Sequence, residues 1–171
     1  MADWGDRYAS LLGRRLQALI WMPITGDTPQ LVAEFKSRSF SYSGAAFLAF
    51  ENAEPLILTW SQVGEKVVLG DAKADAWTRY SLDRIHADRN EVWAVIEGGV
   101  LQSVELYTAP YVDQGRVLAV RHRLARPSGV ASQFWIGTGG AEGVEDRDDL
   151  WVGVDVDPPN FSELVLVGAV S

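Results

Sequence analysis

The sequence predicts an α+β, β-rich single domain made of two pseudo-repeated halves, each a short helix followed by antiparallel strands, packed into one core. Three observations lead to this prediction. Short segments alternate between apolar and polar residues, turn residues separate these segments, and a pattern near the N-terminus recurs half a chain later. The chain has 171 residues, of which 47% are hydrophobic, as expected for one ordinary globular domain. The halves fall at about 1–84 and 85–171, with their sheets side by side or face to face.

The internal repeat rests on six positions that recur eighty-five residues later. Tyr8, Leu11, Gly13, Leu16, Gln17 and Leu19 correspond to Trp93, Ile96, Gly98, Leu101, Gln102 and Val104. A half-unit of this size cannot bury a sufficient core alone, so each half is expected to supply the partner face of the other. Matches of this kind also arise by chance among common residue types, and that alternative stays open.

The first half is predicted to begin with a short amphipathic helix and to continue in strands. Trp4, Tyr8 and Leu11 follow helical spacing, and Gly13 stands where a helix would end. The next segment, 15–22, also fits a helix, but its repeat partner alternates in a strand-like way, so a strand is predicted. Further strands are predicted at 31–36, 45–50, 56–60 and 66–69, with a helix from Pro29 as the alternative for the first of these.

The second half is predicted to repeat this scheme after a connecting region, 71–90, of packed turns or short helices. A short helix is expected at 91–97, with Gly98 and Gly99 ending it. Phe47–Phe50 is echoed by Phe134–Gly137 at an offset of eighty-seven. The predicted strands of this half are 100–108, 116–124, 134–137, 150–155 and 163–167.

Negative charge is concentrated in one segment of the chain. The net charge is -8, and residues 142–157 hold seven carboxylates against one arginine. This balance argues against nucleic acid as a partner, because phosphate affinity depends on basic side chains. We expect a docking surface for a basic protein here, and the alternative is a solvated loop that protects a sheet edge. The predicted partner-binding residues are Glu142, Glu145, Asp146, Asp148, Asp149 and Trp151.

Cofactor and metal sites are not predicted. The chain has no cysteine, which excludes disulfides and thiolate chemistry. The glycine-rich segment 137–143 lacks the lysine and the glycine spacing of phosphate-binding loops. The aspartates at 146–149 do not have the spacing of a calcium loop. An acidic N-terminus and the lack of a run of about twenty apolar residues predict a cytoplasmic protein that has no membrane partner.

A basic strand forms the alternative binding site. Arg121, His122 and Arg123 stand together, and an anion bound there could also contact Trp135. The alternative interpretation is a charged strand face that keeps the protein in solution. No serine stands in a nucleophile-elbow context, so no catalytic residue is predicted. Most tryptophans fall within apolar segments, which indicates core packing rather than a stacking groove.

These observations favour a non-enzymatic, acidic protein-interaction domain, such as an inhibitor or immunity-type protein that docks on a basic partner. The alternative is a small-ligand-binding domain with its pocket between the two halves. An enzyme of unknown class is the third hypothesis, because no acid, base and nucleophile can be seen to converge. The oligomeric state and the identity of the partner do not follow from the sequence.

Overall fold

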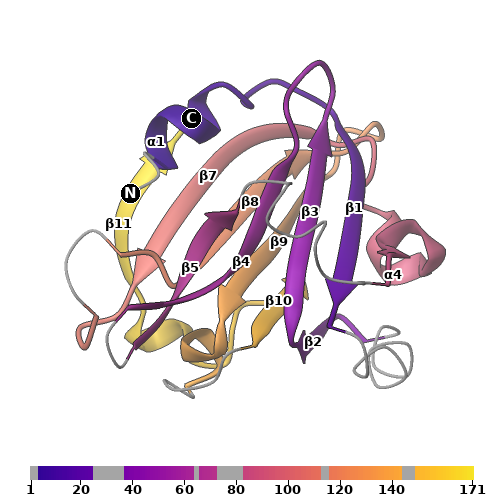
Figure 1. The fold of residues 1–171 in the computed structure, drawn as a ribbon. Coiled ribbons are helices and arrows are strands. Elements are labelled where there is room, and N and C mark those ends of the chain that lie inside the picture. The colour runs from indigo at the N-terminus through magenta and orange to yellow at the C-terminus, as the bar shows by residue number, and fades with distance from the viewer. Residues whose placement is uncertain (1–3, 25–36, 64–65, 73–82, 113–115, 144–148) are drawn as a thin grey trace.

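The computed structural model describes residues 4–24, 37–63, 66–72, 83–112, 116–143 and 149–171. These residues form two antiparallel β-sheets that face each other across a shared core (Figure 1). The first sheet has the order β5-β4-β3-β1-β6, and the second has the order β11-β7-β8-β9-β10-β2. Of the two predicted arrangements, the face-to-face one is therefore correct for the described residues.

The first sheet is built around β1, which pairs with β3 on one side and with β6 on the other. Every residue of β1 from Leu19 to Pro23 is buried, as expected for a strand with neighbours on both edges and a second sheet against it. The strands of this sheet are β1 (Leu16–Pro23), β3 (Gly44–Phe50), β4 (Leu56–Val63), β5 (Lys66–Ala72) and β6 (Ile85–His86).

The second sheet has a meander of four strands at its centre, and β8 shows how the sequence sets its two faces. Val120, His122 and Leu124 are buried toward the first sheet, while Arg121 and Arg123 point the other way. The strands are β7 (Val100–Thr108), β8 (Ala119–Ala125), β9 (Ala131–Thr138), β10 (Leu150–Val154), β2 (Ser39–Tyr42) and β11 (Val165–Val170).

Helices contribute little to the described residues, which contain only two short α-helices, α1 (Trp4–Ala9) and α4 (Glu91–Ala94). The Asn90 side chain caps α4 by accepting a hydrogen bond of 2.8 Å from the Val92 amide. Single 3-10 turns lie at Ala87–Arg89 (η1), Gly139–Glu142 (η2) and Phe161–Glu163 (η3). None of the helices in the described part of the chain has the length and hydrophobicity needed to cross a bilayer.

Each sheet includes one strand from the other part of the chain. The first sheet consists of strands from residues 16–72 plus β6, and the second sheet consists of strands from residues 100–170 plus β2. Thus β2 pairs with β10 at the edge of the second sheet. This arrangement ties the two parts of the chain together through main-chain hydrogen bonds as well as through the core.

A short antiparallel pairing of residues 13–16 with residues 98–101, here called the clasp, joins the starts of β1 and β7. Gly13 and Gly98 both adopt left-handed conformations, with φ of 74° and 78°, which glycine accepts without strain. The four main-chain bonds are Gly13 N to Leu101 O at 2.9 Å, Gly98 N to Leu16 O at 2.8 Å, Leu16 N to Gly99 O at 2.8 Å and Leu101 N to Arg14 O at 2.9 Å. The first two bonds form one pair and the last two form another. Within each pair, adding eighty-five to one residue number and subtracting eighty-five from the other converts one bond into its partner.

The side chains next to the clasp are buried at matching positions. Tyr8 and Trp93 are both fully buried, and so are Leu16 and Leu101. The correspondence does not extend along the whole chain. β3, which contains Phe47, is adjacent to β1, whereas β9, which contains Phe134, is separated from β7 by β8. The predicted match of Phe47–Phe50 with Phe134–Gly137 is therefore not a match of equivalent strands.

An aromatic cluster fills the space between the sheets. Trp21 of β1 packs edge to face against Trp93 at 4.9 Å and against Phe40 of β2 at 5.6 Å between ring centroids. Trp21 and Trp93 are fully buried, so each of these large side chains contributes its whole apolar surface to the core. The prediction that tryptophans pack in the core is confirmed for Trp21, Trp93, Trp135 and Trp151, whereas Trp60 is only half-buried and Trp77 lies outside the described residues.

Several predicted elements differ from the observed ones. The helix predicted at 91–97 is a single turn, because the chain leaves the helix after Ala94 to reach the clasp. The strand predicted at 116–124 begins only at Ala119. β2 and β6 were not predicted, since each is too short to show a pattern. The predicted strand 31–36 lies outside the described residues.

Gly44 should be intolerant of any side chain. A Cβ atom built there would lie 2.1 Å from the Met22 carbonyl oxygen, because the backbones of β1 and β3 approach closely at this point. We expect Gly44→Ala to lower the free energy of unfolding by more than about 3 kcal/mol, since backbone atoms cannot move aside cheaply. Urea denaturation measures this change.

The matched control is Gly70→Ala in β5 of the same sheet, where the nearest atom would be the Ser61 Cβ at an ordinary 3.4 Å. This variant should lose less than about 1 kcal/mol. Equal losses in the two variants would contradict the close approach at Gly44.

Candidate functional site

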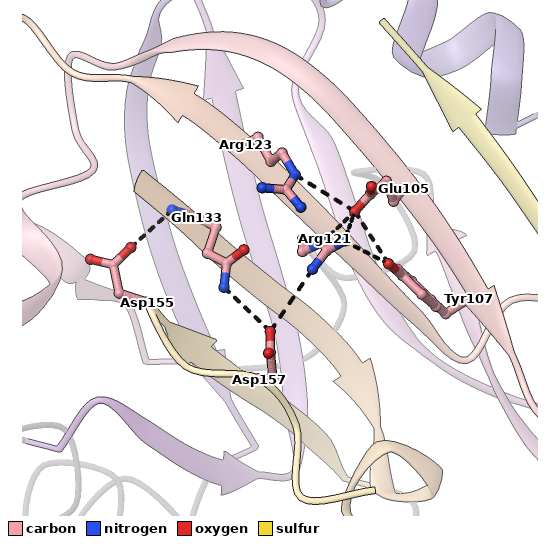
Figure 2. Close-up of polar contacts among 7 residues, drawn as sticks. All are labelled: Glu105, Tyr107, Arg121, Arg123, Gln133, Asp155 and Asp157. Carbon is pink, nitrogen blue, oxygen red and sulfur yellow. Dashed lines mark hydrogen bonds and ion pairs between the residues drawn. The ribbon is translucent and has the colours of Figure 1, made fainter. Parts of the chain in front are cut away.

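The outer face of the second sheet, meaning the face turned away from the first sheet, carries the polar cluster of the described residues. Alternate side chains of β7, β8 and β9 point to this face, and Figure 2 shows most of them. Strand pairing places Arg121 between Glu105 on β7 and Trp135 on β9. The outer-face cluster consists of Glu105, Tyr107, Arg121, Arg123, Gln133, Trp135, Asp155 and Asp157.

Arg121 lies at the centre of the outer-face cluster and is held by aromatic rings. Its guanidinium carbon lies 5.1 Å from the ring centroid of Trp135, 5.5 Å from that of Tyr107 and 5.7 Å from that of Phe161. Only 12% of the Arg121 side chain is exposed. Three ring contacts around one weakly hydrated cation stabilise its position, because desolvated cation–π contacts are stronger than exposed ones.

Glu105 supplies the negative charge for Arg121. The two side chains form a hydrogen-bonded ion pair, and the Tyr107 hydroxyl donates to the same carboxylate at 3.2 Å. Burial alone would raise the pKa of Glu105, but the hydrogen bond and charge of Arg121, with help from Arg123, lower it below its usual value. Burial raises the pKa of the Tyr107 hydroxyl, so this group stays a protonated donor. The central cation is therefore already neutralised within the protein.

Asp155 forms a second neutralised centre where β10 ends. Its carboxylate accepts hydrogen bonds from Arg126 Nη2 at 2.8 Å, from the Ser132 hydroxyl at 2.9 Å and from the backbone N–H of Gln133 at 3.0 Å. Asp155 has a φ of 51°, a left-handed conformation that is unfavourable for most residues. The three hydrogen bonds offset this cost and fix the turn that brings the following residues back over β9.

Residues 155–164 form a strap across the outer face. Val156, Phe161 and Leu164 pack on a small cluster that includes Trp135 and Trp151. Asp157 lies 3.3 Å from Gln133 Nε2 and 3.9 Å from Arg121 Nη1, and 46% of its side chain is exposed (Figure 2). The strap therefore covers the aromatic part of the face and leaves one carboxylate at its border with solvent.

A shallow depression of about 270 Å³ remains open beside the strap. It is lined by Arg123, Ala131, Ser132, Gln133 and Asp155. Arg123 is the cation of this lining, and 46% of its side chain is exposed, with its Nε 3.7 Å from Glu105. The depression offers donors to a small polar molecule, with Asp155 already occupied by its three hydrogen bonds.

The structure separates the four residues of the predicted ligand site. Arg121, Arg123 and Trp135 share the outer face, but Trp135 is fully buried beneath the strap. His122 points to the opposite side, into the core, where it is fully buried. Adjacent residues of a regular strand point to opposite faces, so a strand cannot bring Arg121 and His122 to one ligand.

His122 contacts the side chains of α1 and β9 within the core. Its Nε2 lies 2.8 Å from the Tyr8 hydroxyl of α1, and its ring stacks on Phe134 with centroids 4.2 Å apart. Burial lowers the pKa of His122 to about 3, against a weaker opposing contribution from the Phe134 backbone. The imidazole is therefore neutral at ordinary pH and links the first helix to the second sheet.

Half of the residues of the predicted acidic docking surface lie outside the described residues. This holds for Glu145, Asp146 and Asp148. Glu142 ends the turn η2, and Asp149 is half-buried directly before β10. Trp151 is only 2% exposed and packs with Trp135 on the outer face, so its ring is part of the folded interior.

Sequence reasoning did not select Glu105, Tyr107, Asp155 or Phe161 as members of the cluster. A signal was present for two of them, because Glu105 and Tyr107 are two residues apart in the predicted strand 100–108 and therefore share one face of it. Their contact with Arg121 depends on the register of β7 against β8, which no local pattern determines.

Among the described residues, no three histidine or carboxylate side chains come close enough together to hold a metal ion. Comparison of the chain with known protein families, with curated proteins and with solved structures finds no match.

His122 should make the protein less stable in acid. The unfolded chain takes up a proton near the ordinary pKa of 6.5, whereas the folded state does so only near pH 3. The neutral His122 therefore costs the folded state no stability above pH 6.5, and the protein loses stability through this group as the pH falls from 6.5 toward 3. Between pH 7 and pH 5 this group should lower the free energy of unfolding by about 2 kcal/mol, measured by urea denaturation at each pH.

The double variant Tyr8→Phe/His122→Phe removes the titrating group and its hydroxyl partner together, so that no buried polar atom of the pair is left unsatisfied. It should lose this part of the pH dependence. His86→Gln changes the second histidine of the chain, which is half-buried, and should retain the effect. An unchanged pH dependence in the double variant would show that His122 is not its source.

Proposed function

We propose that this protein is a non-enzymatic, acidic interaction domain that docks on a basic protein partner, in the manner of a small inhibitor or immunity protein. The observation that carries the proposal is the presence of five carboxylates and one arginine within residues 142–149. Concentrated charge of one sign steers association with a partner of the opposite sign and gives the complex its specificity.

The pairing within the outer-face cluster supports this proposal. Arg121 is neutralised by Glu105, and Arg126 is neutralised by Asp155. These two guanidinium groups are consequently engaged with carboxylates that lie outside residues 142–149. The excess of carboxylates within residues 142–149 is thus additional to these two ion pairs.

The position of the acidic segment in the fold also favours docking. Residues 142–149 connect β9 to β10, and these strands pair from Thr138 and Leu150 onward. The buried side chain of Trp151 packs against Trp135 and fixes the start of β10. Both ends of the acidic segment are thus attached to a rigid sheet, which lowers the entropic cost of presenting it to a partner.

We further infer that the two halves derive from one duplicated unit. The support comes from the clasp, where two pairs of hydrogen bonds are interchanged by the same offset of eighty-five residues. Any antiparallel pairing interchanges its hydrogen bonds about a local two-fold axis, but here the offset of that axis equals the offset of the sequence repeat. Strand exchange through β2 and β6 would then be the feature that made the duplicated chain one domain.

A small-ligand-binding role is the second candidate, and the depression beside Arg123 is the observation that favours it. The seam between the halves is filled by Trp21, Phe40 and Trp93, so the depression is a better location for a ligand than the seam. An enzyme ranks third, because His122 is buried in contact with Tyr8 and Phe134 rather than facing a substrate.

Removing acids from the segment should weaken docking. We expect Asp146→Asn/Asp148→Asn/Asp149→Asn to bind immobilised polylysine at least about tenfold more weakly at low salt, and with a smaller salt dependence, because local charge governs steering. Surface plasmon resonance over a salt series measures both effects. The same variant should fail to capture, from an extract of the native organism, the basic protein that the unmodified chain retains.

The control removes the same amount of charge elsewhere. Glu51, Glu54 and Asp88 are exposed and lie far from residues 142–149 in the sequence. Their replacement by Gln, Gln and Asn should leave binding nearly unchanged. Equal weakening in both triple variants would mean that net charge alone drives the binding, which contradicts a local docking surface.

The second candidate predicts a different result. If the depression binds a small anion, citrate should raise the melting temperature of the protein by several degrees, because a ligand of the folded state stabilises that state by mass action. Arg123→Ala should abolish the shift, whereas replacement of Arg15, an exposed arginine at the clasp, should not. A shift that survives Arg123→Ala would place the binding elsewhere.

A further inference from the structure

We propose that the outer edge of β11 pairs antiparallel with β11 of a second copy of this chain, so that the two six-stranded sheets join into one continuous sheet. This inference is independent of the acidic docking surface, because β7 and β8 separate β11 from β9 and β10, the strands on either side of residues 142–149. The partner is a second copy, and the interface is centred on Leu166.

β11 is the outermost strand of the second sheet and pairs only with β7 in the described residues. Three consecutive aliphatic side chains at its start are exposed, with 46% for Val165, 52% for Leu166 and 48% for Val167. Unpaired main-chain groups beside exposed aliphatic side chains form a template for a further strand.

The other sheet edges carry charges that discourage such pairing. Lys66 lies within β5, Arg84 precedes β6 and Arg38 precedes β2. In contrast, the chain has no charged residue and no proline from Leu164 to Ser171. Among the edge strands of the described residues, β11 is thus the one that lacks both of these protective features.

Charge favours a second copy as the occupant. Two chains of net charge -8 repel one another unless they meet at a neutral surface far from their acidic segments. Sheet order puts three strands between β11 and β10, which corresponds to about 19 Å at the usual strand spacing. This separation exceeds the physiological screening length of about 8 Å. β11 contains no carboxylate, so this edge offers no opposite charge to a basic protein.

The register of the pairing is also compatible with charge. In a symmetric antiparallel pairing centred on Leu166, Val165 lies opposite the partner's Val167, and Leu166 lies opposite the partner's Leu166. Glu163, which ends the turn η3 two residues before β11, lies opposite the partner's Ala169, so that no like charges face each other. A two-fold arrangement of this kind closes on itself and yields a dimer rather than a fibre.

The edge also contains an irregularity that limits its affinity. The register of β11 against β7 shifts between Leu166 and Gly168, which leaves Val167 in a bulge. A bulge twists an edge and shortens the regular pairing available to another strand. We therefore expect a reversible dimer in the micromolar range, at the weak end of specific association.

Sedimentation velocity tests the proposal directly. The unmodified chain should shift from monomer to dimer as its concentration rises from about 1 to about 300 µM. Val167→Lys should remain monomeric, because it places two ammonium groups in a neutral interface. Val130→Lys changes a valine of similar exposure, 56%, in the turn between β8 and β9, and should dimerise like the unmodified chain.

Cross-linking tests the register. The chain has no cysteine, so Leu166→Cys introduces a single thiol that lies opposite itself in the proposed pairing. Mild oxidation should convert this variant to a covalent dimer much faster than Val130→Cys, which reports random collision. Circular dichroism establishes that each variant is folded.

A monomer at every concentration would overturn the proposal. So would dimerisation of Val167→Lys at the unmodified affinity, equal cross-linking of the two cysteine variants, or growth into open-ended polymers, which would show that the contact is not two-fold. Loss of dimerisation in Val167→Lys alone, together with selective cross-linking at 166, supports it.

Discussion

The clasp is the constraint on which the rest of this structure depends. It fixes the start of β1 beside the start of β7, and these two strands belong to opposite sheets. Four main-chain hydrogen bonds hold this junction, and glycines with positive φ at positions 13 and 98 let the chain turn into it from each helix. Once the two strands diverge from this point, their apolar faces are directed at one another, and the aromatic cluster around Trp21 fills the space between them.

Local sequence patterns predicted the strands well and the pairing between strands poorly. β1, β3, β4 and β7 were predicted close to their observed bounds, because runs of apolar or alternating residues between turn signals reflect burial directly. β2 and β6 were not found, since two to four residues contain no period. Their positions follow from long-range pairing with β10 and β1, which depends on the folded context.

The same limit explains how much of the site was predictable. The sequence placed Arg121 and Arg123 on one face of a strand, which is correct, but it also included His122, which alternation sends to the core. The contacts that decide the chemistry of Arg121 come from Glu105, sixteen residues earlier, and from Phe161, forty residues later. Nothing local marks these residues as partners, because the register of β7 against β8 and the path of the strap bring them together.

The outer face shows why charged residues in a sheet do not by themselves make a binding site. Arg121 combines a paired carboxylate with three aromatic rings, and Asp155 combines a paired guanidinium with two further donors. Each charge has within the protein the kind of partner that a ligand would otherwise supply, so an incoming molecule must displace an existing interaction to gain one. This is why the proposed docking on a basic partner is assigned to the excess of carboxylates within residues 142–149 rather than to the outer face, and why the proposed self-pairing is assigned to the neutral edge at β11.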